Sequence, residues 1–461
     1  MKILLAASEV VPFAKTGGLA DVAGALPLAL EGLKQEIIVI MPQYRALKGK
    51  TQAKIGENIK VYFIKQDKYF DRPGLYGEKT GDYPDNLDRF SFFCQKALEL
   101  TKKIGFQPDI IHCHDWQSAL IPIYLKALYE DDGFFKNTKT LLTIHNIGYQ
   151  GIFPKDEFPK LGLDWSFFTM DTLEFYDKIN ILKGGMAFVD AINTVSPTYS
   201  KEIMTREQGF GLEGLLQKKQ DRVFGIINGL DYNLWDPAKD AFISKKYSPD
   251  SAQDKRINKE ALQKECKLPA KSEIPLFGFV GRLAEQKGID ILQQAIEKIY
   301  QMDAQVVILG TGEEKYHALL QNIATRYPKQ VCLFLKFDDG LAHRIYSGCD
   351  IFLMPSLYEP CGLGQMISFK YGTPVIAHKT GGLSDTVIDF DFRANLGNGF
   401  IFDRYYRDAV TSAMLRAILA FQDRKGWQEL IQRCMKMNFS WAESGKKYID
   451  LYNLLLGKKK K

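Results

Sequence analysis

The sequence predicts an α/β protein that consists of two doubly wound domains facing each other across a cleft. Short apolar runs alternate with longer amphipathic stretches along most of the chain. The short runs are apolar almost throughout, which is typical of parallel strands covered by helices on both faces. A polar stretch without any strand pattern separates them into two groups, so we expect two sheets.

Eleven runs are candidate strands. In the first group they are residues 2–7, 36–42, 108–114, 140–146, 190–195 and 223–228, and in the second 274–281, 304–310, 330–337, 350–356 and 373–378. Amphipathic stretches such as 289–301 follow them and make βαβ units. In sheets of this kind, ligands bind beyond the carboxyl ends of the strands.

The polar stretch 236–273 contains three prolines and no strand pattern, so we place the domain boundary there. We expect an N-terminal domain over 1–240, a linker over 241–273 and a C-terminal domain over 274–440. The last segment, 441–461, follows Ser440 and Glu443, which have capping-box spacing. We expect it to form a helix that packs back on the N-terminal domain.

Composition excludes several classes of protein. The 461 residues are 46% hydrophobic and 25% charged, as in soluble globular proteins. The net charge of +6 includes the final lysine run and no basic stripe, so we expect no nucleic-acid partner. Seven cysteines without a CxxC spacing indicate reduced thiols in a cytoplasmic protein. No apolar run is long enough for a membrane span, so we expect no membrane association.

The motif KTGGL occurs twice, at Lys15–Leu19 and at Lys379–Leu383. Both copies precede a stretch that can form a helix, and the N–H groups at a helix start attract anions. Two such loops facing each other would suit a substrate that carries a pyrophosphate. The alternative is that each pair of glycines only forms a tight turn.

GRLAEQKG, at Gly281–Gly288, follows a predicted strand. It places Arg282 and Lys287 at the carboxyl end of that strand, where a guanidinium fork and an ammonium group can clamp a phosphate. The alternative is a charged surface loop with ordinary ion pairs.

EPCGLGQM, at Glu359–Met366, follows another predicted strand. A carboxylate there can bind sugar hydroxyls or stabilise positive charge at a reacting carbon. The next residues can present backbone N–H groups at a helix start: Cys361, Gly362 and Leu363. The alternative is that Glu359 only caps a helix.

Three polar residues lie at the ends of two neighbouring strands of the first domain. Asp115 follows the strand that carries His112 and His114, and His145 and Asn146 end the next strand. Two histidines spaced two apart can hold a metal, but no further ligand is evident, so we interpret them as hydrogen-bonded residues. We interpret Asp115, His145 and Asn146 as site residues.

Two other patterns are weak. Gly310 and Gly312 resemble part of a dinucleotide fingerprint but lack its third glycine. Asp389 and Asp391 form an acidic pattern that is common by chance. We therefore expect neither a nicotinamide cofactor nor a metal.

Together these segments resemble the glycogen and starch synthases, which are nucleotide-sugar glucosyltransferases with two Rossmann-like domains, the GT-B fold. The resemblance covers nearly the whole chain and rests on ten motifs in the family's order. They are KTGGLADV at 15, HCHDW at 112, TIHN at 143, GLEGLL at 211, INGLDYNLWDP at 227, GRLAEQKG at 281, AHRIYSGCD at 342, EPCGLGQ at 359, KTGGLSDTV at 379 and SWAESGKKY at 440.

The resemblance implies transfer of glucose from ADP-glucose to the non-reducing end of an α-1,4-glucan such as glycogen, with retention of configuration and without a further cofactor. It assigns the catalytic roles to Glu359, His145, Arg282 and Lys287. The donor-binding residues that it implies are Lys15, Gly17, Gly18, Asp115, Asn146, Asn228, Phe337, Cys361, Gly362, Leu363, Thr380, Gly381 and Gly382. The two KTGGL motifs would then lie on either side of one donor site.

Two positions depart from the family's pattern. Phe337 stands where an aromatic residue with a hydroxyl is frequent near the nucleotide base, and Gly364 stands where threonine is common. Two other functions remain open on the residues alone. They are another retaining nucleotide-sugar glucosyltransferase with a small-molecule acceptor, and a non-catalytic glucan-binding protein.

Overall fold

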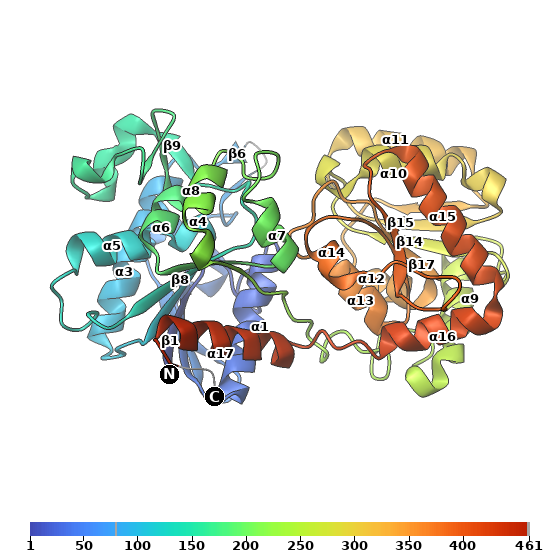
Figure 1. Ribbon diagram of the computed structural model, residues 1–461, viewed down its shortest axis with the longest axis horizontal. Helices are drawn as coiled ribbons and strands as arrows, with labels where there is room; N and C mark the ends of the chain where they lie inside the picture. The colour runs from blue at the N-terminus through green and yellow to red at the C-terminus, as the bar shows by residue number, and fades with distance from the viewer. Residues whose placement is uncertain (79–80, 459–461) are drawn as a thin grey trace. The chain divides into compact units, whose positions relative to one another are not determined.

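The computed structural model describes residues 1–78 and 81–458, which fold into two compact units (Figure 1). Unit 1 comprises Met1–Gly229 together with the chain from Trp441 onward, and unit 2 comprises Leu230–Ser440. Each unit is built around its own mainly parallel sheet.

Unit 1 contains an eight-stranded sheet of order β13-β12-β8-β7-β1-β2-β4-β3. All neighbouring strands pair in parallel except β3 and β4, which are antiparallel at the edge. The strands are β1 (Lys2–Ala6), β2 (Glu36–Pro42), β3 (Gln52–Ile55), β4 (Ile59–Ile64), β7 (Ile110–His114), β8 (Lys139–Ile144), β12 (Ala191–Thr194) and β13 (Val223–Gly225). The strand order reverses direction between β1 and β7, so this is the switch point at which such sheets bind ligands.

Unit 2 contains a six-stranded parallel sheet of order β16-β15-β14-β17-β18-β19. The strands are β14 (Leu276–Val280), β15 (Gln305–Leu309), β16 (Val331–Phe334), β17 (Ile351–Met354), β18 (Val375–His378) and β19 (Gly399–Phe402). In chain order this is 3-2-1-4-5-6, the doubly wound arrangement, and its switch point lies between β14 and β17. The predicted fold class is therefore confirmed.

Helices and smaller strands complete each unit. In unit 1 they are α1 (Gly18–Gly32), α2 (Asp67–Phe70), α3 (Asn86–Lys103), α4 (Asp115–Ser118), α5 (Leu120–Leu128), α6 (Ile181–Phe188), α7 (Pro197–Glu202), α8 (Glu213–Lys218) and α17 (Trp441–Leu455), with short η1 (Arg45–Leu47), η2 (Lys155–Leu161), η3 (Trp165–Phe167) and η4 (Gln220–Arg222). Two small antiparallel sheets pair β5 (Gly77–Glu78) with β6 (Gly81–Asp82), and β11 (Lys178–Asn180) with both β9 (Ile152–Pro154) and β10 (Glu174–Phe175).

In unit 2 the helices are η5 (Pro249–Asp254), α9 (Lys255–Glu265), η6 (Glu285–Lys287), α10 (Ile289–Ile296), η7 (Ile299–Met302), α11 (Glu314–Arg326), α12 (Asp339–Gly348), α13 (Gly364–Lys370), α14 (Gly381–Thr386), α15 (Arg407–Gln422) and α16 (Arg424–Met435). The central strands β15 and β17 are buried at every residue, which shows that both faces of this sheet are covered. None of the helices in the described residues is long and apolar enough to cross a membrane.

Helix α17 belongs to unit 1, where it crosses α1 and packs against it (Figure 1). Gly445 permits this close contact, because a Cβ atom there would lie 3.3 Å from the side chains of Ala29 and Leu33. Tyr448 and Tyr452 are fully buried on the same helix. Their hydroxyls reach the sheet, so α17 is attached to unit 1 by polar contacts as well as by apolar burial.

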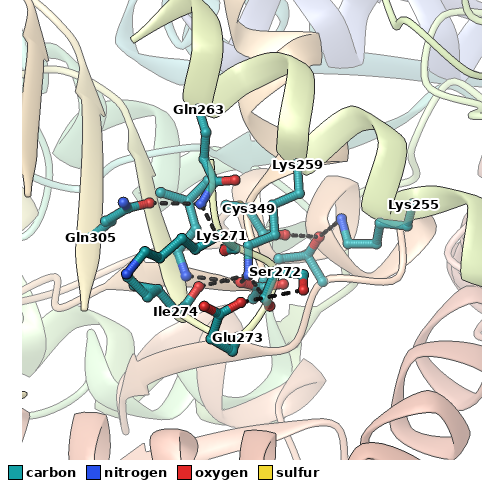
Figure 2. Close-up of polar contacts among 12 residues, drawn as sticks. Lys255, Lys259, Gln263, Lys271, Ser272, Glu273, Ile274, Gln305 and Cys349 are labelled. Atoms are coloured by element: carbon teal, nitrogen blue, oxygen red, sulfur yellow. Dashed lines mark hydrogen bonds and ion pairs between the residues drawn. The ribbon is translucent and has the colours of Figure 1, made fainter. Parts of the chain in front are cut away.

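The stretch expected to be a linker, 241–273, is part of unit 2 and includes η5 and α9. Two buried lysines of α9 contribute to this attachment (Figure 2). Lys255 Nζ donates to the carbonyls of Tyr346 and Ser347. Lys259 Nζ donates to the carbonyl of Ile274 and forms a 2.6 Å ion pair with Asp350. The stretch looks polar because the buried residues of α9 are mostly polar, and the linker prediction is wrong for this reason.

Candidate active site

The first KTGGL loop leads from the end of β1 into α1, at the switch point of unit 1. Glu9 holds this loop: its buried carboxylate accepts hydrogen bonds from the Thr16 N–H and, at 2.7 Å, from the Thr16 hydroxyl. The Gly17 N–H donates to the same carboxylate at 3.3 Å, and Tyr76 donates its hydroxyl at 2.6 Å. Glu9 is not among the predicted site residues, although an acidic residue in an otherwise apolar N-terminal stretch is a signal for such a role.

The glycines of this loop face open space. A Cβ atom at Gly17 or Gly18 would have no neighbour within 4 Å, so packing does not require glycine there. The Lys15 side chain is exposed and forms a 2.8 Å ion pair with Asp21 of α1. This exposed pair is worth little energy, so Lys15 can exchange Asp21 for an anionic ligand at small cost.

Asp115 and His145 meet at the ends of β7 and β8. The Asp115 carboxylate accepts the His145 backbone N–H at 2.7 Å. Asp115 has a positive φ of 53°, which is uncommon for a residue other than glycine. Burial raises the pKa of Asp115 to about 7, and the nearby charge of Glu9 adds to this rise. The predicted site residues Asp115 and His145 therefore lie together, close to the carboxylate that holds the KTGGL loop.

A buried histidine network lies directly beneath them. His114 Nδ1 is 2.9 Å from His145 Nε2. His112 Nδ1 is 2.9 Å from the Tyr452 hydroxyl of α17, and its Nε2 is 2.7 Å from the Thr143 hydroxyl. Burial lowers the pKa of His112 and of His145 to about 3 and that of His114 well below its usual value. All three imidazoles are therefore neutral near pH 7, and His112 is hydrogen-bonded as predicted.

We expect this network to make the protein less stable in acid. An unfolded histidine has a pKa of 6.5, whereas folded His112 has a pKa of about 3. Between these values the unfolded state binds a proton that the folded state does not, so the free energy of unfolding falls as pH falls through this window. Asp115 has the opposite effect on the free energy of unfolding in acid, because its pKa is raised in the folded state. The test is urea denaturation from about pH 7 to about pH 4 for the wild type and His112→Gln, and we expect a smaller acid-induced loss in the variant. Equal losses in the two proteins would contradict this explanation.

In unit 2, the GRLAEQKG loop and the EPCGLGQM segment meet at the switch point between β14 and β17. Lys287 Nζ forms a 2.6 Å ion pair with Glu359, whose buried carboxylate also accepts the Ser356 hydroxyl at 2.9 Å. Gly288 has a φ of 72°, and a Cβ atom there would lie 1.9 Å from the Pro355 carbonyl oxygen. Gly288 therefore allows the Lys287 loop to pack directly against the segment that leads to Glu359.

Arg282 is exposed beside this pair and donates to Gln286 at 2.8 Å. Helix α13 begins at Gly364 with Leu363 at its N-cap, and no side chain caps it. The alternative that Glu359 caps this helix is therefore wrong. Lys287 and Glu359 are paired with each other, and Arg282 is exposed beside them. The Arg282 guanidinium is therefore available for an anion.

The second KTGGL loop differs physically from the first. Gly381 has a φ of 43°, and a Cβ atom there would lie 2.0 Å from the Glu359 carbonyl oxygen. A Cβ atom at Gly382 would lie 1.9 Å from the Cys361 carbonyl oxygen. The Gly382 N–H donates to the Glu359 carbonyl at 3.0 Å. These glycines are therefore needed for close packing against the Glu359 segment, while Thr380 is buried beside them.

The remaining predicted site residues also lie beyond strand ends. Phe337 lies between β16 and α12 and is 81% exposed, so its ring is open to a ligand. Asn228 follows β13 in unit 1 and is buried, and its Oδ1 has no hydrogen-bond partner among the described residues. Cys361 is buried, and the neighbouring Gly362 has a positive φ of 74°.

The weak patterns have structural explanations. Cβ atoms at Gly310 and Gly312 would lie 2.0 Å and 2.2 Å from the carbonyl oxygens of Gly281 and Leu283, so both glycines serve close backbone packing. Asp389 forms an ion pair with Arg416, and Asp391 accepts backbone N–H groups of its own turn. Within residues 1–78 and 81–458, no three His, Cys, Asp or Glu side chains gather closely enough to hold a metal ion.

Comparisons with known proteins agree with this architecture. The sequence model of the starch synthase catalytic domain family matches residues 2–218. The sequence model of the family of glycosyl transferases group 1 matches residues 261–432. The structure of the catalytic domain of starch synthase IV from Arabidopsis thaliana, bound to ADP and acarbose, superposes with a TM-score of 0.89 at 33% identity and covers 99% of each chain. Sucrose-phosphate synthase from Thermosynechococcus elongatus shares the fold, with a TM-score of 0.65 at 18% identity over 99% of each chain.

These matches and the two doubly wound units define a glycosyltransferase of the GT-B fold. The glycogen synthase of Geotalea daltonii is 47% identical over 482 residues, and the alignment covers 100% of both chains. That of Syntrophotalea carbinolica is 44% identical over 98% of both chains. The chain belongs to the glycogen synthase family.

Proposed function

We propose that this chain is an ADP-glucose-dependent glycogen synthase, which transfers glucose to the non-reducing end of an α-1,4-glucan and retains the α-configuration. The observation that carries the proposal is the full-length identity of 47% to a glycogen synthase. The ADP and acarbose bound by the similar starch synthase support the choice of donor and acceptor. The seven cysteines, all in the described part of the chain, form no disulfide, which suits a cytoplasmic enzyme.

The chemical problem is the departure of a nucleoside diphosphate from C1 of glucose. Negative charge grows on the β-phosphate while positive charge grows on C1. Arg282 and Lys287 supply positive charge for the leaving phosphate, with help from the Thr380 loop. Preorganised charge of this kind is usually the largest catalytic contribution. Lys287 is paired with Glu359, so a bound diphosphate competes with Glu359 for this lysine.

Glu359 and His145 act on the sugar. Glu359 is a carboxylate that can stabilise positive charge at C1. His145 is neutral near pH 7 because burial lowers its pKa to about 3, so it contributes a hydrogen bond to a hydroxyl rather than a charge. The proton of the acceptor hydroxyl can pass to the leaving phosphate on the same face of the sugar. A double displacement with a protein nucleophile is the alternative route.

The other predicted residues bind the donor in this proposal. In unit 1 they are Lys15, Gly17, Gly18, Asp115, Asn146 and Asn228, and in unit 2 Phe337, Cys361, Gly362, Leu363, Thr380, Gly381 and Gly382. Phe337 offers an exposed ring for stacking on the nucleotide base, and the Lys15 ammonium is available for the diphosphate.

A donor comparison tests the proposal. We expect a higher kcat/KM for ADP-glucose than for UDP-glucose with glycogen as the acceptor. An equal or higher value for UDP-glucose would contradict the donor assignment. Transfer to glucose or fructose phosphates in place of glycogen would indicate a glucosyltransferase with a small acceptor, and glucan binding without any donor turnover would indicate a non-catalytic protein.

A further inference from the structure

Two histidine rings of unit 1 are in direct contact at the candidate active site. His114, the last residue of β7, places its ring Nδ1 2.9 Å from Nε2 of His145, which follows β8. The planes of the two rings differ by only 24° and their centroids are 5.3 Å apart, so the rings meet edge to edge rather than face to face. Contact between two ring nitrogens at this distance is a hydrogen bond.

Only one of the two facing nitrogens carries a proton. Burial lowers the pKa of both histidines, so both rings are neutral near pH 7. A neutral imidazole has one N–H donor and one acceptor nitrogen, so the proton in the contact belongs either to His114 or to His145. Each choice also decides the state of the outer nitrogens. If His114 donates, His145 carries its own proton on Nδ1, and if His145 donates, His114 carries its proton on Nε2.

The outer nitrogen of His114 distinguishes these two arrangements. His114 is fully buried, and its Nε2 has no hydrogen-bond partner among the described residues. If His145 donated, this Nε2 would be an N–H group that is buried without an acceptor. If His114 donates, the same atom is an unprotonated nitrogen. A buried N–H without an acceptor is the rarer of these two defects in native proteins, so the surroundings of His114 favour the arrangement in which His114 donates.

The outer nitrogen of His145 is the one that a ligand can reach. His145 is partly exposed, and its Nδ1 has no hydrogen-bond partner among the described residues. Unlike Nε2 of His114, this Nδ1 is not closed off from solvent. When the proton is on Nδ1, His145 is a hydrogen-bond donor on its accessible side, and the oxygen of a sugar hydroxyl is a matching acceptor.

The main chains of both histidines are fixed. The His114 N–H donates to Ser118 Oγ at 2.6 Å, and the Ser118 hydroxyl donates to the His114 carbonyl at 2.8 Å. The Asp115 carboxylate accepts the His145 backbone N–H at 2.7 Å. The ring of His112 also stacks on that of His114, with centroids 4.2 Å apart. The contact between His114 and His145 therefore joins two residues that are already held in place.

We propose that His114 is a positioning residue that sets the tautomer of His145. Its Nδ1–H donates to His145 Nε2, and His145 consequently keeps its own proton on Nδ1, where it donates a hydrogen bond to an oxygen of the transferred glucose. This use of His145 rests on the proposed function. His114 is buried and acts only through His145.

The position of the proton can be measured on the wild type. In the full chain with ¹⁵N-labelled histidine, NMR distinguishes the protonated from the unprotonated nitrogen of each neutral ring, and His145→Gln identifies the signals of His145. We expect the His145 proton on Nδ1 at about pH 7 without any ligand, because the ring is neutral there. A proton on Nε2 would overturn the proposal.

Two substitutions of His114 test what the contact does. His114→Phe keeps a planar ring and removes the donor, so we expect mixed tautomers of His145 and a fall of about tenfold in kcat/KM for ADP-glucose, the effect of one lost hydrogen bond. The KM for glycogen stays unchanged. His114→Asn keeps an N–H group close to the position of Nδ1, and we expect it to restore the wild-type NMR signals and kcat/KM.

His112→Gln is the matched control for loss of a buried histidine in the same network. The His112 nitrogens bond to Tyr452 and Thr143 rather than to His145. We expect this variant to lose stability while the NMR signals of His145 and the kcat/KM for ADP-glucose stay close to those of the wild type. Equal losses of activity in His112→Gln and His114→Phe would overturn the proposal, since both histidines would then only stabilise unit 1.

A folded His114→Phe variant with the His145 signals and the kcat/KM of the wild type would also overturn the proposal. The NMR measurement needs no turnover, so it separates this proposal from the proposed function. If the His145 proton lies on Nδ1 in the wild type and loses this preference in His114→Phe, but the wild type transfers no glucose, the positioning role stands and the enzymatic proposal fails.

Discussion

Replacing Glu359 by glutamine is expected to abolish most glucosyl transfer while the protein stays folded. The change keeps the size of the side chain and removes the charge that would face C1 of glucose. The Ser356 hydroxyl can still donate to the amide oxygen, and the Gly382 contact involves only the Glu359 backbone, so the local structure has little reason to change. Loss of one charge-stabilising group typically lowers kcat by roughly 10²–10³.

The measurement is kcat with ADP-glucose and glycogen, together with the thermal unfolding midpoint of each variant. Glu285→Gln is a matched control, because Glu285 lies in the same region but is exposed. Glu359→Gln also leaves Lys287 without its partner, so a small loss of stability is expected. A variant that unfolds like the wild type and keeps near-normal kcat would show that the charge of Glu359 takes no part in the reaction.

Arg282→Ala and Lys287→Ala are each expected to lower kcat by roughly 10²–10³, since each removes positive charge from the leaving phosphate. Enzymes that lack such side chains often use a divalent metal for this purpose. In this protein Asp389 and Asp391 are engaged in structural contacts. We therefore expect that neither Mg²⁺ nor Mn²⁺ restores activity to these variants and that EDTA does not inhibit the wild type.

Lys315→Ala is the control for the loss of a positive charge outside the candidate site. It breaks the exposed ion pair with Glu313. We expect its kcat to stay close to that of the wild type, because exposed pairs of this kind are worth little. Activity of the wild type that disappears in EDTA and returns with either ion would contradict the assignment. Asp389 and Asp391 would then be the next residues to substitute.

The central strands of both sheets could be predicted from the sequence, because a strand buried on both faces is apolar at nearly every position. All eleven predicted runs contain an observed strand. Three strands of the two large sheets were not predicted. The edge strand β3 (QAKI) is short and half polar, β4 (IKVYFI) is partly exposed, and β19 (GFIF) is short and begins with glycine. Such strands are defined by their partners rather than by their own pattern.

The site could be predicted in part, since its candidate residues follow predicted strands directly. The sequence does not reveal how they are held. Glu9 lies six residues before Lys15 and holds the adjacent Thr16 and Gly17, and this depends on how the chain returns after β1. The two KTGGL motifs have identical letters, but only the second packs against backbone. Likewise, Lys255 and Lys259 in α9 look like surface residues until their carbonyl partners are known.

In the proposed reaction, glucose from ADP-glucose joins the non-reducing end of an α-1,4-glucan. The most direct test is to incubate the protein with glycogen and ADP-glucose that carries a labelled glucose, and then to digest the polymer with β-amylase, which releases maltose from non-reducing ends only when the linkage is α-1,4. We expect the label to enter the polymer and to be released as maltose. Label that stays in soluble sugar, or that enters the polymer but resists β-amylase, would contradict it.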